Sequence, residues 1–158
     1  MRAIALLLLL AACQRAAPVP DTPGSRLEAA AVARGLVADA GAAVTGSWAR
    51  EGDRLCIVPA GDGLRLGASV DYGEGQGCAA SGTVRRTGSG LRVAFGECRF
   101  DAGYDGERIS FPAVLPAACD RFCSGRASLS ALSVERLSES VSEAQTLRGA
   151  NGLLLCGG

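Results

Sequence analysis

Between positions 54 and 111 the chain alternates apolar and polar residues in short runs separated by glycine-bearing turns. This period of two is the pattern of a β-strand that buries one face. The runs are 54–58, 64–70, 83–86, 91–95 and 108–111. Short strands at such regular spacing are typical of all-β domains. The sequence therefore predicts a small antiparallel β-barrel or sandwich.

Turn residues indicate how neighbouring runs pair. If the hairpin at 87–90 is centred on its Gly-Ser pair, Arg85 lies opposite Arg92. The Asp-Gly pair at 105–106 predicts a second hairpin that joins 100–103 to the run at 108–111. The apolar tail at 153–156 predicts a last strand.

Two capping boxes predict helices outside the strands. Ser25 with Glu28 marks the start of an N-terminal helix over 25–39. Ser140 with Glu143 marks the start of a second, shorter helix. The expected fold class is thus mainly β (α+β), a barrel or sandwich with an N-terminal helix and a short C-terminal helix.

The N-terminus has the features of a secretory signal, because Arg2 precedes the apolar run 3–12. That run is half the length of about 20 residues that a membrane-spanning helix needs. It ends in Leu10-Ala11-Ala12-Cys13, which resembles the lipobox of bacterial lipoproteins. The resemblance implies cleavage before Cys13 and lipidation of its thiol and new amino group. Gln14 after the lipidated cysteine implies sorting to the outer membrane, facing the periplasm.

Composition divides the rest of the chain. Residues 14 to 24 hold three prolines among small residues, which favours an extended tether. The predicted parts are a signal peptide at 1–12, the lipidated cysteine and tether at 13–24, the N-terminal helix and its connection at 25–43, and a disulfide-bonded β domain at 44–158.

Cysteine content predicts three disulfides in this exported domain. Seven cysteines minus the lipidated one leave six, which are Cys56, Cys78, Cys98, Cys119, Cys123 and Cys156. Six cysteines allow 15 pairings, and the hairpin at 87–90 favours Cys78 with Cys98. Cys119 and Cys123 have an alternative role in thiol-disulfide exchange or metal binding, although their spacing is not that of thioredoxin-like motifs.

Charge and residue content exclude several functions. Sixteen arginines balance 16 acidic residues, so no net field recruits nucleic acid. The chain has no histidine, which removes Ser-His-Asp and Cys-His catalysis and the commonest metal ligand. The carboxylates of Glu74, Glu97, Asp101 and Glu107 could in principle hydrolyse a glycoside, but the chain offers few aromatic residues as a sugar platform. We predict no enzyme, no cofactor and no metal.

Three segments are candidates for binding. The acidic turn of Asp101, Asp105 and Glu107 lacks the ligands of a calcium loop at Gly103 and Pro112, which favours a plain hairpin. The glycine-rich stretch 71–77 lacks the ending of a phosphate loop, which favours a flexible loop with Tyr72 as a contact point.

The third candidate is the arginine pair of the first hairpin. Arg85 and Arg92 facing each other across two strands repel unless an anion or a neighbouring carboxylate lies between them. We expect a solvated face here, with an anion site as the alternative.

Gly46-Ser47-Trp48 followed by Arg54-Leu55-Cys56-Ile57-Val58 is similar to the opening of small periplasmic protease-inhibitor barrels. In size, anchor and disulfides the chain also resembles lipidated lysozyme-inhibitor barrels. Cys123-Ser124-Gly125 has the Ser-Gly start of their inhibitory loop but no tyrosine after it. As a whole the chain resembles an uncharacterised class of small alphaproteobacterial lipoproteins, a resemblance that implies no activity.

These observations give three hypotheses. The leading one is a membrane-anchored, non-enzymatic binding module for an envelope protein or cell-wall glycan, with a hydrolase inhibitor as its sharpest form. The second is a thiol-disulfide protein that uses Cys119 and Cys123. The third is a structural component of the envelope.

Overall fold

The computed structural model of the chain describes residues 22–33, 43–88 and 90–157. The leader, Cys13 and most of the predicted tether lie outside these residues. The chain divides into two compact units, Met1–Val37 and Ala38–Gly158. Within the described part, no helix has the length and apolar content needed to cross a membrane.

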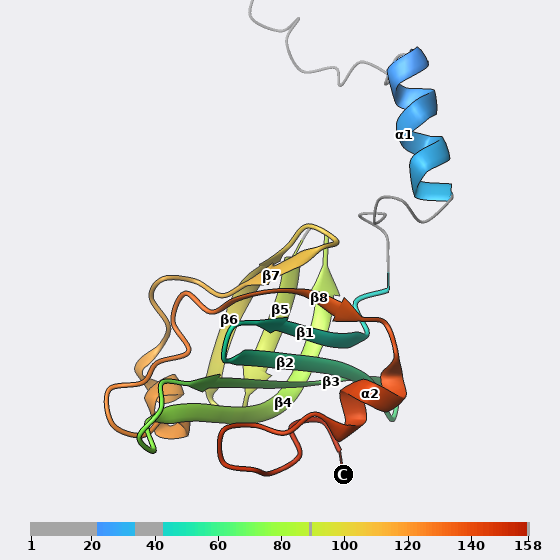
Figure 1. The fold of residues 1–158 in the computed structure, drawn as a ribbon. Coiled ribbons are helices and arrows are strands. Elements are labelled where there is room, and N and C mark those ends of the chain that lie inside the picture. The colour runs from blue at the N-terminus through green and yellow to red at the C-terminus, as the bar shows by residue number, and fades with distance from the viewer. Residues whose placement is uncertain (1–21, 34–42, 89, 158) are drawn as a thin grey trace, which may run out of the picture. The chain divides into compact units, whose positions relative to one another are not determined.

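The second unit is a closed antiparallel β-barrel (Figure 1). Its eight strands are β1 (Gly46–Arg50), β2 (Asp53–Ala60), β3 (Gly63–Asp71), β4 (Gly77–Thr87), β5 (Gly90–Phe95), β6 (Cys98–Tyr104), β7 (Arg108–Ser110) and β8 (Ser133–Ser138). Each strand pairs with the next along the chain, and β8 pairs with β1 to close the barrel. The predicted mainly β fold is confirmed, and of the two predicted architectures, barrel and sandwich, the structure is the barrel.

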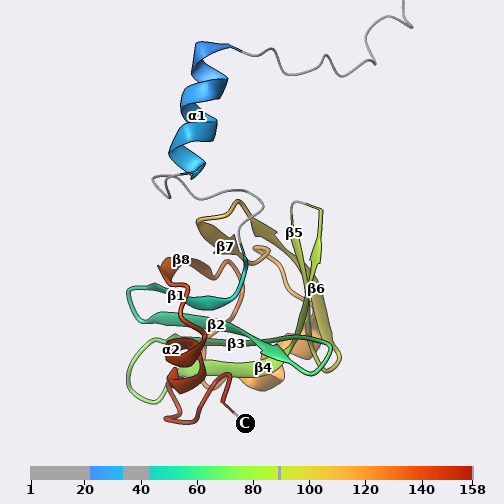
Figure 2. The ribbon, with the colours of Figure 1, turned by 90° about the vertical axis from the view of Figure 1, so that its right-hand side faces the viewer.

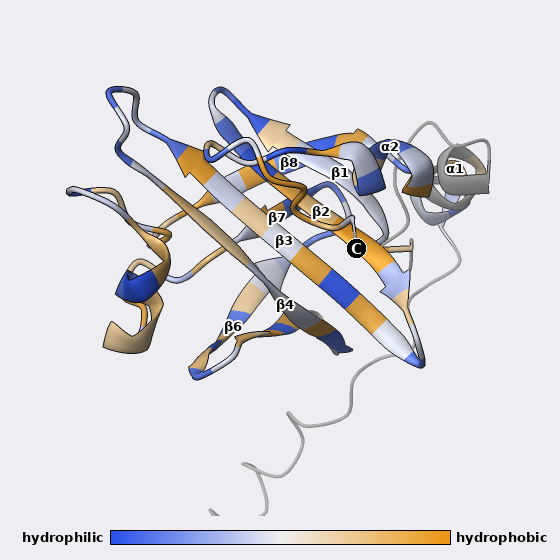
Figure 3. Ribbon diagram, turned by 90° about the horizontal axis from the view of Figure 1, so that it is seen from below, coloured by the Kyte–Doolittle hydropathy of each residue, from blue (hydrophilic) through white to orange (hydrophobic). Residues whose placement is uncertain are grey.

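Side chains fill the barrel interior. The largest fully buried ones belong to Trp48, Phe95, Leu55, Ile57, Leu66, Leu91 and Ile109. Phe100 and Phe111 pack edge to face with ring centroids 4.7 Å apart. An eight-stranded barrel is just wide enough for its inward side chains. Figure 3 shows the alternation that produces this core, with hydrophobic and hydrophilic residues following one another along β3.

A second, smaller cluster covers the outer face of β2, where α2 (Val141–Thr146) packs (Figure 2). Its buried members are Cys56, Val58, Ala144, Leu155 and Cys156. A disulfide joins Cys56 to Cys156. The predicted cap of this helix is confirmed, because the Glu143 amide donates to Ser140 Oγ at 3.3 Å.

The first helix, α1 (Pro23–Ala33), begins earlier than predicted. The Thr22 amide donates to Ser25 Oγ at 2.9 Å, and the Ser25 amide donates to Thr22 Oγ1 at 3.2 Å. Thr22 therefore caps the helix, and Pro23 takes the first helical position, where its missing amide hydrogen costs nothing. The predicted start at Ser25 is wrong.

The tail at 153–156 is not a strand. It forms only an isolated bridge between Arg148 and Leu154, and Leu153 is 66% exposed. The reason is that β8 already occupies the free edge of β1, with Trp48 opposite Arg136. The tail therefore has no strand edge to pair with, and its disulfide holds it outside the barrel.

The predicted hairpins are confirmed. Arg85 lies opposite Arg92 and Thr87 opposite Gly90. Tyr104 lies opposite Ile109 across the second predicted turn.

Three disulfides form, but the predicted pair of Cys78 with Cys98 is wrong. Cys78 is bonded to Cys123, and Cys98 is bonded to Cys119. The cause is a separation of β4 from β5, which pair only from Thr83 onward. Before that residue, β4 pairs with β3 and, at Cys78, forms a bridge with Cys123. The 3-10 helix η2 (Ala117–Phe122) contacts both β4 and β6, and the two disulfides attach it to them.

Candidate functional site

One end of the barrel carries a turn and a loop segment that are attached to each other. The turn, 72–76, joins β3 to β4, and the segment, 121–126, consists of the last two residues of η2 and the four that follow. The disulfide between Cys78, just after the turn, and Cys123, within the segment, joins the two. We call these two segments together the loop platform.

Ser124 is the main polar link within the loop platform. Its amide donates to the Gly77 carbonyl at 2.8 Å. Its hydroxyl donates to the Gly75 carbonyl at 2.9 Å and accepts from the Gly77 amide at 3.2 Å. One serine therefore satisfies backbone groups on a segment that lies almost 50 positions earlier in the chain.

The turn itself is also hydrogen-bonded throughout. The Gly73 amide donates to Asp71 Oδ1 at 2.9 Å, and the Tyr72 amide donates to the Gln76 carbonyl at 2.9 Å. Gln76 Oε1 accepts the Arg126 amide at 3.2 Å. The glycines predict a flexible loop, whereas the structure shows a hydrogen-bonded turn. The sequence did not reveal this because Ser124 and Arg126, which contact the turn, lie almost 50 positions later.

The loop platform borders a groove of about 640 Å³. Residues of the turn, of the segment 121–126 and of a third loop at 150–151 line it. Phe122 lies in its wall and packs against Phe95, with ring centroids 5.9 Å apart. Arg121 pairs with Glu97 at 3.2 Å. The groove thus combines an aromatic ring, one guanidinium, backbone polar groups and the carboxylates of Asp71 and Glu74.

Tyr72 projects from this end with 59% of its surface exposed. Glu74, two residues later, has a positive φ of 51°, a conformation that costs a residue with a side chain about 1 to 2 kcal/mol. The same end of the barrel carries the loop after β7, in which Val114 is 84% exposed. Tyr72 and Val114 are thus two large apolar side chains that are exposed at this end of the barrel.

The structure does not bring Tyr72 together with the two predicted binding arginines. β4 begins beside the Tyr72 turn and reaches Arg85 only near its far end. Arg92 opposite it donates from Nε to Asp101 Oδ1 at 3.0 Å. That hydrogen bond, with the charge of Asp101, raises the pKa of Arg92. The carboxylate lies beside Arg92 on the side away from Arg85.

The predicted acidic turn is a hairpin. Asp105 Oδ1 accepts the amides of Glu107 and Arg108 at 3.0 and 2.7 Å. Partial desolvation raises the pKa of Asp105, but these two hydrogen bonds and the Arg108 charge outweigh it, so the pKa is lowered. No three potential metal ligands of the His, Cys, Asp or Glu types gather anywhere in the described residues.

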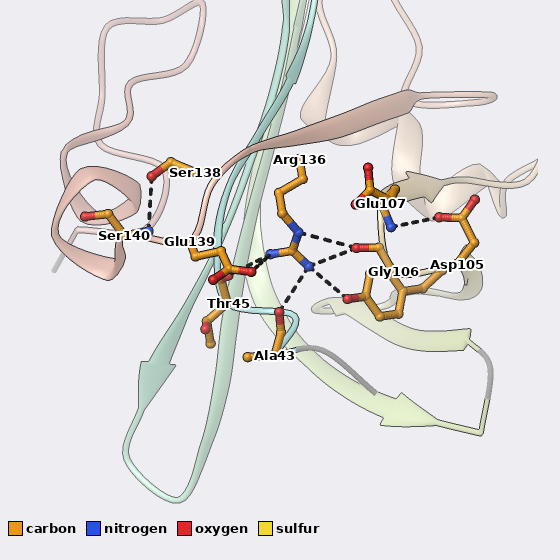
Figure 4. A network of polar contacts seen from close by, with 10 residues as sticks. Ala43, Thr45, Asp105, Gly106, Glu107, Arg136, Ser138, Glu139 and Ser140 are labelled. Atoms are coloured by element: carbon orange, nitrogen blue, oxygen red, sulfur yellow. Dashed lines mark hydrogen bonds and ion pairs between the residues drawn. The ribbon is translucent and has the colours of Figure 1, made fainter. Parts of the chain in front are cut away.

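A polar cluster that the sequence did not predict lies at the opposite end of the barrel (Figure 4). The Arg136 guanidinium lies 4.2 Å from the centre of the Trp48 ring, and the side chain is only 12% exposed. Its Nη2 donates to Tyr104 Oη at 3.0 Å and to the Gly106 carbonyl at 3.0 Å. The one sign of this cluster in the sequence is that Arg136 lies two positions after the apolar Val134 on β8, in phase with the side chains that face the barrel interior.

Arg136 also holds the chain that enters the barrel. Its Nη2 donates to the Ala43 carbonyl at 3.1 Å, and Nη1 lies 3.7 Å from Glu139 Oε1. Trp48 Nε1 is buried and lacks a hydrogen-bond partner among the described residues. These contacts join β1, β8 and the β6–β7 turn, which assigns the cluster a structural role in closing this end.

Cys119 and Cys123 are not joined to each other, since each is bonded to a cysteine of a strand. This arrangement favours structural disulfides over a dithiol exchange pair. The resemblances to known inhibitor barrels gain no support from direct comparison. No family model, curated protein or solved structure matches this chain.

Proposed function

We propose that this chain is a non-enzymatic binding module of the bacterial envelope and that its partner is a protein that docks on the loop platform. The observation that supports this most strongly is the rigid attachment of the Tyr72 turn to the segment 121–126. A surface that is ordered before binding loses less entropy in the complex. An exposed tyrosine beside a groove is typical of an energetically dominant contact.

The packed interior supports an external binding surface. Trp48, Phe95 and the other core side chains occupy the space in which some other eight-stranded barrels hold a small ligand. A partner would therefore meet the loops and the outer face. The loop platform is the part of that surface where apolar exposure, a groove and covalent rigidity coincide.

The sharpest form of the proposal is an inhibitor of an envelope hydrolase. A disulfide-braced turn that presents one bulky side chain can enter an enzyme cleft without a large ordering cost. Tyr72 is the residue that would enter, and the groove beside it would receive a rim residue of the enzyme.

The three disulfides are typical of an oxidising compartment outside the cytoplasm. Beyond that location we propose a lipid anchor on Cys13 and placement at the outer membrane, facing the periplasm. Two or more acyl chains would hold the protein stably, because each buried methylene contributes about 0.8 kcal/mol.

A binding assay with matched variants tests this proposal. The immobilised protein should retain one protein from envelope extracts and protect a lysozyme or protease substrate. Tyr72→Ala should weaken that binding at least tenfold, the loss of a dominant contact. Leu137→Ala is the control, because Leu137 is similarly exposed, at 66%, but lies on β8. Equal binding by wild type and Tyr72→Ala, or no specific binding, would overturn the proposal.

A further inference from the structure

One edge of β6 has no strand beside it along most of its length. On one side, β6 pairs with β5 from Cys98 to Gly103. On the other side, β7 pairs with β6 only at Gly103 and Tyr104. Within the described residues, the edge at 98–102 therefore has no strand next to it on the β7 side. An unpaired strand edge is a template on which another strand can add.

The hairpin between β6 and β7 shows which backbone groups point toward this edge. The Asp105 amide donates to the Arg108 carbonyl at 3.3 Å. Alternate residues of a strand direct their amide and carbonyl groups to opposite sides. The odd-numbered residues of β6 therefore direct theirs toward the β7 side. Arg99 and Asp101 each present one amide and one carbonyl at the unpaired edge.

The connection that follows β7 does not supply the missing partner. The Phe111 amide donates instead to the Leu132 carbonyl, at 2.8 Å. Across the described part of the chain, no hydrogen bond from a turn, a loop or a side chain reaches the backbone of Arg99 or Asp101. Both residues are exposed. Because buried backbone groups are almost always paired, these amides and carbonyls are open to solvent.

The charges on β6 select what can pair with this edge. Arg99 and Asp101 lie two positions apart, so both side chains are on the outer face of the strand. If β6 of a second copy lies antiparallel along the edge, with the twofold axis at Phe100, Arg99 of one copy lies opposite Asp101 of the other. Opposite charges directly across two strands are favourable. The neighbouring registers place Arg99 opposite Arg99, or Asp101 opposite Asp101, and are repulsive.

We propose that the free edge of β6 binds β6 of a second copy of this chain and so forms a twofold-symmetric dimer. The amides of Arg99 and Asp101 in each copy donate to the carbonyls of Asp101 and Arg99 in the other. The same surface is used by both copies, so the contact closes on itself. A ladder this short buries little surface, which makes the dimer weak and dependent on concentration. It goes beyond the proposed binding at Tyr72, because β6 is not part of the loop platform.

Sedimentation velocity over a concentration series tests the proposal, with the full chain in a nonionic detergent whose density matches the buffer. We expect the mass of one chain at low concentration and of two chains at high concentration. Amide hydrogen exchange at Arg99 and Asp101 should slow as the dimer forms, because their amides become hydrogen-bonded. A single chain at every concentration up to about 1 mM, or growth beyond two chains, would overturn the proposal.

Charge reversal tests the register. Arg99→Glu and Asp101→Arg should each weaken the dimer about tenfold, because like charges then face each other across the two strands. An equimolar mixture of these two variants should dimerise again, since every charge then faces an opposite one. Failure of the mixture to dimerise, or single variants that dimerise as the wild type does, would contradict the register.

A control separates this effect from a general change of surface charge. Arg85→Glu reverses another exposed arginine, on β4, where the strand is already paired with β5. It should leave the dimer affinity within about twofold, because an exposed charge away from the contact contributes little. Fluorescence of the single tryptophan, Trp48, reports whether each variant is folded. Equal weakening by Arg85→Glu and Arg99→Glu would show that the β6 edge is not the contact.

Discussion

Cys78 at the start of β4 is bonded to Cys123, which lies 45 positions later, just after η2. This bond fastens the Tyr72 turn to the segment that supplies its hydrogen-bond partners. The proposed binding surface depends on that attachment, and so do several measurable properties of the protein.

Replacing both Cys78 and Cys123 with alanine should lower the free energy of unfolding by about 4 kcal/mol, from the entropy of an unfolded loop of this length. The disulfide between Cys98 and Cys119 closes a shorter loop. Replacing both of these cysteines with alanine should therefore lower the free energy of unfolding by about 3 kcal/mol. Denaturant unfolding measures both values. Peptide mapping without reduction provides the check on pairing, and recovery of a Cys78 to Cys98 peptide would contradict the structure.

Ser124→Ala should loosen the loop platform without unfolding the barrel. The variant loses the hydroxyl that contacts Gly75 and Gly77, so we expect about 1 kcal/mol of destabilisation. Faster amide hydrogen exchange should be confined to the turn 72–76 and the segment 121–126. Ser142→Ala serves as a control, because Ser142 makes one exposed contact, with Ser140. Unchanged exchange in the turn would show that Ser124 does not hold it.

Arg136→Ala should be among the most destabilising single changes, at about 3 kcal/mol. It leaves the Tyr104 hydroxyl and the Gly106 carbonyl without their donor and removes the cation over Trp48. Arg136→Lys should recover only part of this, because an ammonium group lacks the planar fork. Chemical denaturation followed by Trp48 fluorescence measures both. A loss no greater than that of the exposed Arg108→Ala would refute the structural role.

Asp105 should make stability depend on acid pH. Its pKa is lowered below the ordinary 3.8, so its stabilising contribution is present above the unfolded-state pKa and is lost as pH falls through the folded-state pKa. Asp105→Ala should cost about 1 kcal/mol at pH 7. The gap between wild type and variant should close toward pH 2. A gap that stays constant with pH would contradict the assignment.

Local patterns were sufficient to predict much of this fold. The alternation along β3 and β5 and the turn at 87–90 are set by neighbours in sequence, so the barrel and the Arg85 to Arg92 register could be predicted. The cap of α2 is equally local, since Ser140 and Glu143 lie within one turn.

Long-range packing determined what the sequence could not predict. The disulfide partner of Cys78 depends on where β4 leaves β5, and that separation follows from closure of the whole barrel. The rigidity of the Tyr72 turn comes from Ser124, Gln76 and Arg126, which no periodicity connects. Arg136 was missed because a charged residue on a strand is ordinarily expected to face water, whereas this one stacks on Trp48.

The most direct test of the loop platform as a docking surface is site-specific photo-crosslinking in intact cells that produce the protein. A photoreactive phenylalanine analogue placed at Tyr72 should give one discrete protein adduct. The same analogue at Leu137, which is at least as exposed but lies on β8, should give none. No adduct from position 72, or the same adducts from both positions, would contradict the account.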